Sequence, residues 1–247
     1  MIKNYFRSSF MPVLLAGFLI FWSTLTQAQE SDADNGWQFA ITPYLWGADI
    51  GAKTQRGLPI DVSVSDLFDS LEMAFMAAFE ARKNKWLILA DFVYLDLAAS
   101  KTVDSLPINI NLEGTVFHLA GGYNLYQEKS SLDLIFGARN LDVDLGLSSV
   151  IDNSPVSLSR SGNTLDAIIG VKGQLALSKR WYLPYYVDIG TGDTDFTWQA
   201  TAGISFRAAK WVDLALLYRH LEWEFESDKL LQDLNFSGPA FGAIFRF

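Results

Sequence analysis

The chain has two histidines, His118 and His220, and these are its only candidates for an imidazole base. A hydrolase needs such a base within hydrogen-bond reach of a nucleophile, and the base needs an orienting group in turn. No serine stands close to either histidine in a pattern typical of lipid hydrolases. We therefore predict no catalytic residues, and we expect the protein not to be an enzyme.

Acidic residues follow His220 at close spacing. A carboxylate-rich protease rim is one interpretation of them, and a site for divalent cations is another, but no ligand spacing is diagnostic. Runs of charge are more commonly solvated faces. We expect no metal and no cofactor. The acids in question are Glu222, Glu224, Glu226 and Asp228, with Asp142 and Asp144 in a similar position near a rim.

Twelve other ionisable residues lie inside runs in which apolar and polar residues alternate. Alternation with a period of two puts them on one face of a strand. Six are acids and six are bases, and charges confined in a packed interior are costly unless they are paired. We predict that they form an ion-pair network inside a barrel. One layer holds Glu80, Arg82, Asp133, Arg207, Asp213 and Arg246, a second holds Asp91, Arg139, Lys172, Asp188 and Arg219, and Asp166 lies higher.

The alternating runs that position these residues number about ten. Short turns between them alternate with longer connections, as in bacterial barrels with short periplasmic turns and long extracellular loops. The fold class is therefore all-β, a single closed antiparallel transmembrane β-barrel, with eight or twelve strands as alternatives. The predicted strands are residues 36–50, 73–83, 86–99, 112–126, 131–147, 164–177, 181–190, 196–207, 211–225 and 234–247.

The predicted long connections are 51–72, 100–111, 148–163, 191–195 and 226–233. In the first of them, Val64, Leu67, Phe68 and Leu71 have helical spacing, which predicts a short amphipathic helix at the rim.

The uncharged face of the strands carries aromatic residues near its ends. Aromatic girdles at both interfaces are typical of barrels that face lipid. A periplasmic sandwich or a lipocalin-like cup shares the alternation, but it would not need charges deep within the strands of its opposite face. The predicted girdle consists of Trp37, Trp86, Trp181, Trp198 and Tyr218.

Residues 1–28 have the order of a signal peptide. Lys3 and Arg7 precede an apolar run too short to span a bilayer, and small residues follow it. We expect cleavage after Ala28 and a mature barrel domain of residues 29–247. Removing two positive charges takes the formal charge from −9 to −11. Such an acidic chain is not expected to bind nucleic acid, and without cysteine it has no disulfide framework.

Several of these features together resemble the small, largely uncharacterised outer-membrane β-barrel proteins of Gram-negative bacteria. They are the exported N-terminus, the opening strand with Pro43-Tyr-Leu-Trp46, the hairpin from Glu80-Ala-Arg82 to Trp86, and the final Phe247. The resemblance implies a location in the outer membrane and insertion by the assembly machinery, with Phe247 as the assembly signal. It also implies contact with outer-membrane lipid and lipopolysaccharide. It implies no substrate.

The leading hypothesis is a monomeric barrel whose lumen is filled by its own charges and whose role is structural or a surface interaction. Ten strands enclose little more than an eight-stranded barrel, in which side chains fill the interior. A narrow channel or transporter for small solutes is the alternative. A lipid- or peptide-hydrolase at the rim is the third hypothesis.

Overall fold

The computed structural model describes residues 36–54, 59–62, 71–103, 106–151, 154–226 and 231–247, and the predicted signal peptide lies outside them. All regular structure in these residues is β-strand, and no helix among them is long and apolar enough to cross a membrane. The strands are β1 (Gln38–Trp46), β2 (Asp49–Thr54), β3 (Pro59–Val62), β4 (Leu71–Lys83), β5 (Trp86–Val103), β6 (Leu106–Gln127), β7 (Ser131–Ile151), β8 (Ser154–Ala176), β9 (Trp181–Gly192), β10 (Phe196–Ala209), β11 (Val212–Glu224) and β12 (Leu231–Arg246).

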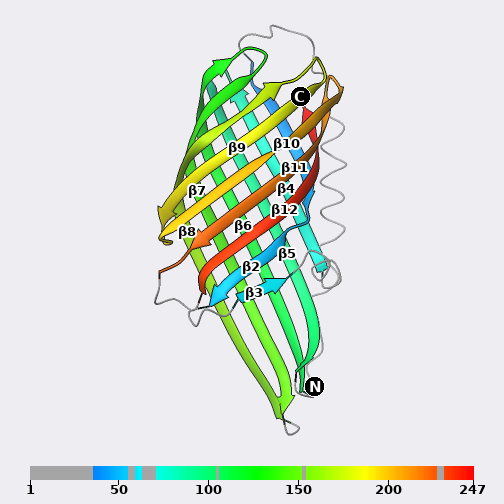
Figure 1. The fold of residues 1–247 in the computed structure, drawn as a ribbon, viewed down its shortest axis with the longest axis vertical. Helices are drawn as coiled ribbons and strands as arrows, with labels where there is room; N and C mark the ends of the chain where they lie inside the picture. Colours follow the sequence, from blue (N-terminus) through cyan, green and yellow to red (C-terminus); the bar gives the residue numbers. More distant parts are fainter. Residues whose placement is uncertain (1–35, 55–58, 63–70, 104–105, 152–153, 227–230) are drawn as a thin grey trace.

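The sheet closes on itself as a barrel (Figure 1). β1 and β4 to β12 form an antiparallel ring of ten strands, and β12 pairs with β1 to complete it. At the seam the backbones of Phe39 and Phe247 exchange hydrogen bonds of 2.9 and 3.0 Å, and their rings stack with centroids 5.8 Å apart. Closure leaves the ring without an unpaired edge. The predicted fold class and strand number are confirmed.

β1 and β2 act as one bent strand along β12. β12 pairs with β1 through residues 240–246 and with β2 through residues 231–237. At the bend, a Cβ atom on Gly238 would lie 1.9 Å from the Gly47 carbonyl oxygen, so this close backbone contact requires glycine.

The prediction of a loop over residues 51–72 is therefore wrong at both ends, since β2 and β3 pair with each other and Leu71 begins β4. The remainder of the predicted helix lies in residues 63–70, outside the described part of the chain.

Strands β5 to β8 are much longer than predicted. The residues assigned to loops at 100–111 and 148–163 continue the ladders, with pairs as far as Val103↔Leu106 and Ile151↔Ser154. Figure 1 shows these strands extending beyond the rest of the barrel as a narrow sheet. We call residues 98–112 and 144–164 the projecting sheet. Alternation continues into one part of it, where Ile108, Ile110 and Leu112 alternate with asparagines, so the loop assigned to residues 100–111 was wrong despite this signal. Residues 159–164 show no such alternation, but the backbone hydrogen bonds that hold a ladder do not depend on side-chain polarity.

The opposite end of the barrel has short turns. The turn between β4 and β5 has two residues, and Asn84 has a φ of 54°, as a hairpin turn of this length requires. Both ends of the ring of strands, at Gln38 and Arg246, also lie at this end. By the usual asymmetry of bacterial barrels this is the periplasmic end, and the projecting sheet is extracellular.

Candidate functional site

Near the periplasmic end, one cluster of charges crosses the lumen. Lys172 forms an ion pair with Glu80. The Glu80 carboxylate also accepts a hydrogen bond from Arg82 at 3.1 Å, and the Arg82 guanidinium lies 2.7 Å from the Asp133 carboxylate. The Asn124 amide donates to the same Asp133 carboxylate at 2.6 Å. These side chains come from β8, β4, β7 and β6. Because β4 and β8 are not neighbours in the sheet, the Lys172–Glu80 pair links opposite walls of the barrel.

A second cluster at the same end surrounds Asp213 on β11. Its carboxylate pairs with Arg246 of β12, lies 3.7 Å from Arg207 Nε of β10, and accepts the Tyr182 hydroxyl at 2.5 Å. The Asp213 side chain is fully buried, whereas the two arginines are partly exposed. This cluster joins four consecutive strands.

The middle layer is the most deeply buried. Arg139 Nη2 lies 2.5 Å from the Asp188 carboxylate, and both side chains are 0% exposed. Arg139 Nη1 also donates to the Thr197 hydroxyl at 3.0 Å. The Gln199 carbonyl oxygen accepts from Arg219 at 2.9 Å and lies 3.5 Å from Arg139 Nη2. Gln199 therefore connects the two arginines.

Arg219 extends this layer across the lumen. Its guanidinium contacts the Asp91 carboxylate at 2.8 Å and donates to the Tyr44 hydroxyl at 2.9 Å, and Tyr44 donates to Asp91 at 2.6 Å. The same guanidinium lies 4.7 Å from the centre of the Trp46 ring, a cation–π contact. His118 is also buried here, and its Nε2 lies 3.2 Å from the Tyr186 hydroxyl.

Of the twelve charged residues predicted for the lumen, eleven take part in an ion pair. Asp166 differs, because its carboxylate accepts from the backbone N–H and the hydroxyl of Thr194, at 3.0 and 2.9 Å. Asp166 is paired in register with Arg139, but no ion pair joins them among the described contacts. Three of the pairs, Lys172–Glu80, Arg82–Asp133 and Arg219–Asp91, join strands at least three apart in the ring, and strand parity does not specify such partners.

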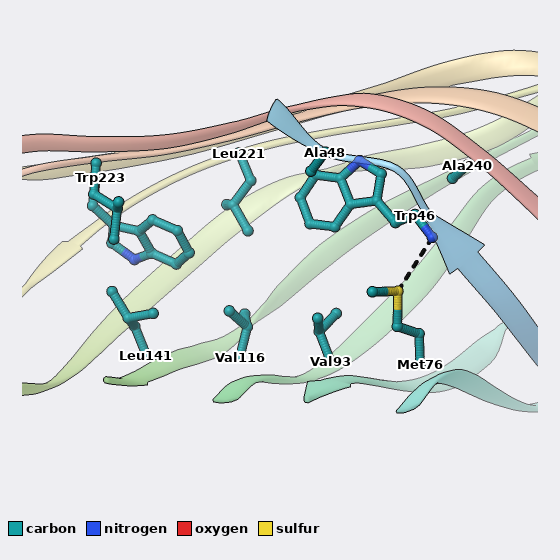
Figure 2. Close-up of a cluster of buried hydrophobic side chains, with 10 residues drawn as sticks. Trp46, Ala48, Met76, Val93, Val116, Leu141, Leu221, Trp223 and Ala240 are labelled. Carbon is teal, nitrogen blue, oxygen red and sulfur yellow. Dashed lines mark hydrogen bonds between the residues drawn. The ribbon is translucent and has the colours of Figure 1, made fainter. Parts of the chain in front are cut away.

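Beyond the middle layer the lumen is apolar, and the expectation that charges fill the barrel is wrong for this part. Figure 2 shows two rows of buried side chains facing each other, with Trp46 and Trp223 in one row and Val93 and Val116 in the other. Trp223 is fully buried. We call this set the apolar layer; it consists of Trp46, Ala48, Met76, Val93, Val116, Leu141, Leu221, Trp223, Leu234 and Ala240.

A cavity of about 530 Å³ occupies the lumen on the periplasmic side of the apolar layer. Arg219 and Gln199 line it at the middle layer, and Gln127 and Glu128 line it near the short turns. Several charges of the two periplasmic clusters also line its wall, together with apolar side chains, and the cavity adjoins the periplasmic end.

The outer wall carries the predicted girdle. Trp37, Trp86 and Trp181 are exposed near the periplasmic end, and Trp211, which the prediction did not include, is exposed there too. Tyr218 is exposed higher on β11. Trp198 is only partly exposed, because its ring packs on His220 and its Nε1 donates to Glu222. Exposed Leu, Ile and Phe side chains cover the wall between these levels. An exterior of this kind faces lipid.

His220 contacts Glu222, one of the acids that follow it in sequence, and also a serine that the sequence did not indicate. Its Nδ1 lies 2.5 Å from the Ser237 hydroxyl, and its Nε2 lies 3.0 Å from Glu222 Oε2. The register of β11 and β12 sets His220 directly opposite Ser237. The structure thus places a serine within hydrogen-bond distance of His220, which the sequence order did not indicate. Ser237 is distant in sequence, and only the strand pairing brings it close.

Asp142, Asp144 and Glu224 lie in other surroundings. Asp142 accepts from the Asn163 amide at 2.7 Å on the exposed surface, and Asp144 and Glu224 are exposed. Asp228 lies outside the described residues, and Glu226 ends a described segment. Within the described residues, no group of three or more His, Asp or Glu is arranged to hold a metal ion.

No protein-family model matches the chain, and no curated protein is similar to it in sequence. Among solved structures, the outer-membrane protease OmpT from Escherichia coli is similar, with 10% identity and a TM-score of 0.52 over 89% of this chain and 99% of that one. The translocator domain of the autotransporter NalP from Neisseria meningitidis aligns with 14% identity and a TM-score of 0.48, over 96% of each chain. Ail from Yersinia pestis aligns with 15% identity and a TM-score of 0.41, over 86% of this chain and 99% of that one.

At these identities the likeness to OmpT concerns the fold alone. Together with the closed ring and the apolar exterior, it means that the chain folds as an outer-membrane β-barrel of the Gram-negative type.

Proposed function

We propose that the protein is a non-conducting outer-membrane barrel with a structural or surface-interaction role, similar to small uncharacterised barrels of Gram-negative bacteria. The apolar layer is the observation that carries this proposal. Trp223 and Leu221 are fully buried inside the lumen, together with side chains from the facing wall. An ion that crossed such a layer would lose its hydration without gaining polar partners. The alternative of a narrow solute channel is therefore disfavoured.

The ion pairs support the same role. Arg139 and Asp188 form a pair with no exposed side-chain surface, and Lys172 and Glu80 tie together walls that are not adjacent in the sheet. A wide aqueous pore would screen such charges and make their pairing unnecessary. In a packed lumen the pairing is needed, and it holds the strands in one register.

We expect the purified, refolded protein to give no stable single-channel conductance in a planar bilayer. Among the described residues, the apolar layer lies between the cavity and the outer end of the lumen, so an ion would have to cross it. Insertion of the barrel is checked by its resistance to protease in vesicles made in parallel. A large and reproducible conductance from inserted protein would overturn the proposal in favour of the channel hypothesis.

The projecting sheet supplies the surface for an interaction. Among the described residues, 98–103 of β5 pair only with β6, and 154–164 of β8 pair only with β7. Each segment therefore has one edge whose backbone groups are not used within the described sheet. An open edge is a template on which an extended segment of another protein can add a strand.

We expect a cysteine placed in the projecting sheet to be accessible from outside the cell. Ser159 is exposed on β8, and the chain has no cysteine of its own, so Ser159→Cys creates a single labelling site. A membrane-impermeant maleimide should label it on intact cells. As a matched control, Ser178→Cys in a short turn should react only after the outer membrane is permeabilised. If Ser178→Cys were labelled on intact cells and Ser159→Cys were not, the barrel would have the opposite orientation, and the proposed surface role would be excluded.

The partners of the barrel are part of this proposal. We propose contact with outer-membrane lipid and lipopolysaccharide along the apolar wall, and insertion by the outer-membrane assembly machinery through β12 and the Phe247 that follows it. No nucleic acid and no cofactor enter this role. The ring is closed within one chain, which is compatible with a monomer.

A further inference from the structure

We propose that Ser237, His220 and Glu222 form a hydrolytic site on the outer wall of the barrel, and that its substrate is the acyl ester of a lipid in the outer leaflet. The proposal goes beyond the structural role, because these side chains face away from the lumen and take no part in its ion pairs.

The three side chains have the contacts that a nucleophile, a base and an orienting carboxylate require. Glu222 Oε2 lies 3.0 Å from His220 Nε2, and an ionised carboxylate only accepts hydrogen bonds, so Nε2 carries the proton. In the neutral ring Nδ1 is then an acceptor, and the Ser237 hydroxyl 2.5 Å away is its donor. This is the protonation pattern in which a serine is activated by an adjacent imidazole.

Trp198 holds the side chains of His220 and Glu222 in place. Its ring packs on the imidazole of His220 with centroids 4.4 Å apart, and its Nε1 donates to Glu222 Oε2 at 3.1 Å. His220 and Glu222 are each about three-quarters covered, with exposed side-chain fractions of 24% and 25%. Trp198 belongs to a third strand, so it holds the base and the carboxylate in place before a substrate binds. A chance contact between surface side chains would not need this support.

The site lies where the outer wall changes from apolar to polar. On the outward face of β11, exposed Leu216 and Tyr218 precede His220 and Glu222, and on β12, Phe241 and Pro239 lie opposite that apolar pair. At about 3.3 Å per residue and a tilt of about 40°, His220 is about 20 Å above the periplasmic turn. The apolar band of such barrels is about 25 Å tall. This depth is close to the outer interface, where the ester groups of outer-leaflet lipids lie.

This location selects the substrate class. A lipid whose chains lie against Leu216 and Phe241 brings its ester groups to the level of Ser237 without leaving the membrane. A peptide would have to reach a site on the lipid-facing wall, which is not at the mouth of the lumen. The acyl ester is therefore favoured over the peptide bond, and phospholipids and lipopolysaccharide share this chemistry.

The reaction balances with water as the only co-reactant. Ser237 Oγ attacks the ester carbonyl carbon while its proton passes to His220 Nδ1. The bond from that carbon to the lipid alcohol then breaks, and the alcohol oxygen takes the proton from Nδ1 as it leaves. Water attacks the resulting acyl-serine and loses a proton to Nδ1, the bond to Oγ breaks, and the proton returns to Oγ. The products are a free fatty acid and a lipid with one acyl chain fewer.

The Glu222 carboxylate stabilises the imidazolium formed in each step. Asn235 is a side-chain donor on the same face of β12, two residues before Ser237, and it is paired in register with Glu222. A Cβ atom on Gly51 would lie 2.8 Å from Asn235 Nδ2, so the glycine of the neighbouring β2 leaves the space that this amide occupies. The amide is thus a candidate donor to the oxyanion of the tetrahedral intermediate.

The test uses the full refolded protein with two kinds of vesicle, one of phosphatidylethanolamine and one containing lipopolysaccharide, and measures free fatty acid. Release from either vesicle supports the proposal and identifies the source of the ester. We expect His220→Ala to lower the rate by about 10²- to 10⁴-fold, the usual contribution of a general base. Ser237→Ala should abolish release, and Ser159→Ala, on the projecting sheet, should leave it unchanged.

A fluorophosphonate probe, which phosphonylates activated serines with loss of fluoride, provides a readout on the unmutated protein that does not depend on a variant folding. Mass mapping of the unmutated protein should find the probe on Ser237, and His220→Ala should remove this label. Absence of both label and fatty-acid release from folded protein would overturn the proposal, as would release that Ser237→Ala does not reduce. In that case the cluster is an interfacial hydrogen-bond network only.

Discussion

Replacing Arg139 by alanine is expected to lower the free energy of unfolding by about 3–5 kcal/mol, the usual cost of breaking a buried ion pair. Arg139 and Asp188 are 0% exposed and lie 2.5 Å apart. Without the guanidinium, the Asp188 carboxylate would remain buried and lose its principal partner. Asp188→Ala should have an effect of similar size, because it leaves the arginine without its counter-charge. Urea unfolding in lipid vesicles, followed by tryptophan fluorescence, measures both changes.

Two controls separate a buried pair from charge loss in general. Lys53 pairs with Asp233 on the surface and its side chain is 63% exposed, so Lys53→Ala should cost no more than about 1 kcal/mol. The double variant Arg139→Met with Asp188→Leu removes both charges and fills the space with apolar groups, and it should be more stable than either single alanine variant. A loss below about 1 kcal/mol for Arg139→Ala would contradict the network.

Replacing Trp223 by alanine is expected to destabilise the barrel by about 3–5 kcal/mol, as for other fully buried large side chains. The Trp223 ring is fully buried in the apolar layer, where it also packs edge-on against Phe236. Removal of the indole leaves a cavity that the surrounding strands cannot close, because backbone hydrogen bonds fix the spacing between the ten strands of the barrel.

The same change should alter the permeability of the lumen. The double variant Trp46→Ala with Trp223→Ala removes the largest side chains of the apolar layer, and we expect it to show channel openings that the unmutated protein lacks. Trp211→Ala provides the matched control, since Trp211 is exposed on the outer wall. It should neither open the lumen nor cost more than about 1 kcal/mol. A double variant that stays sealed would mean that the ion pairs alone close the barrel.

Much of the architecture followed from the alternation of side chains. In a strand the period of two fixes which residues share a face, so the inward charges and the outward aromatics were assigned without knowledge of the fold. The short turns, such as that at Asn84, fixed the order of the hairpins. Both signals are local, because they depend on neighbouring residues within a strand or a turn, and a ring of ten strands could be predicted from them.

The extent of the strands could not be predicted in this way. Alternation marks a strand only where one of its faces is apolar, and residues 159–164 are all polar or glycine, although Ile108, Ile110 and Leu112 do alternate with asparagines. The ladder continues there from Leu97 to Val103 because backbone pairing requires no particular side chain. The same limit explains β2 and β3, which extend the barrel wall where the sequence indicated a loop.

Within the lumen, the sequence determined which charged residues point inward, and the tertiary structure decided their partners. Glu80 and Lys172 meet because the walls of a narrow barrel face each other, and a sequence carries no direct record of that distance. The apolar layer also depends on the tertiary structure, because Trp46 and Trp223 come from strands at opposite ends of the chain.

The cluster of His220, Ser237 and Glu222 shows most clearly how the contribution of the sequence differs from that of the tertiary structure. The outward position of His220 was fixed by its own strand, whose parity is a local property. Its pairing with Ser237 depends on the register between β11 and β12, which the turn between them and the closure of the ring set together. A shift of one residue would turn Ser237 toward the lumen. The sequence by itself thus determined the strands, their faces and the barrel, whereas the tertiary structure alone determined which side chains meet, because those contacts join residues from different strands.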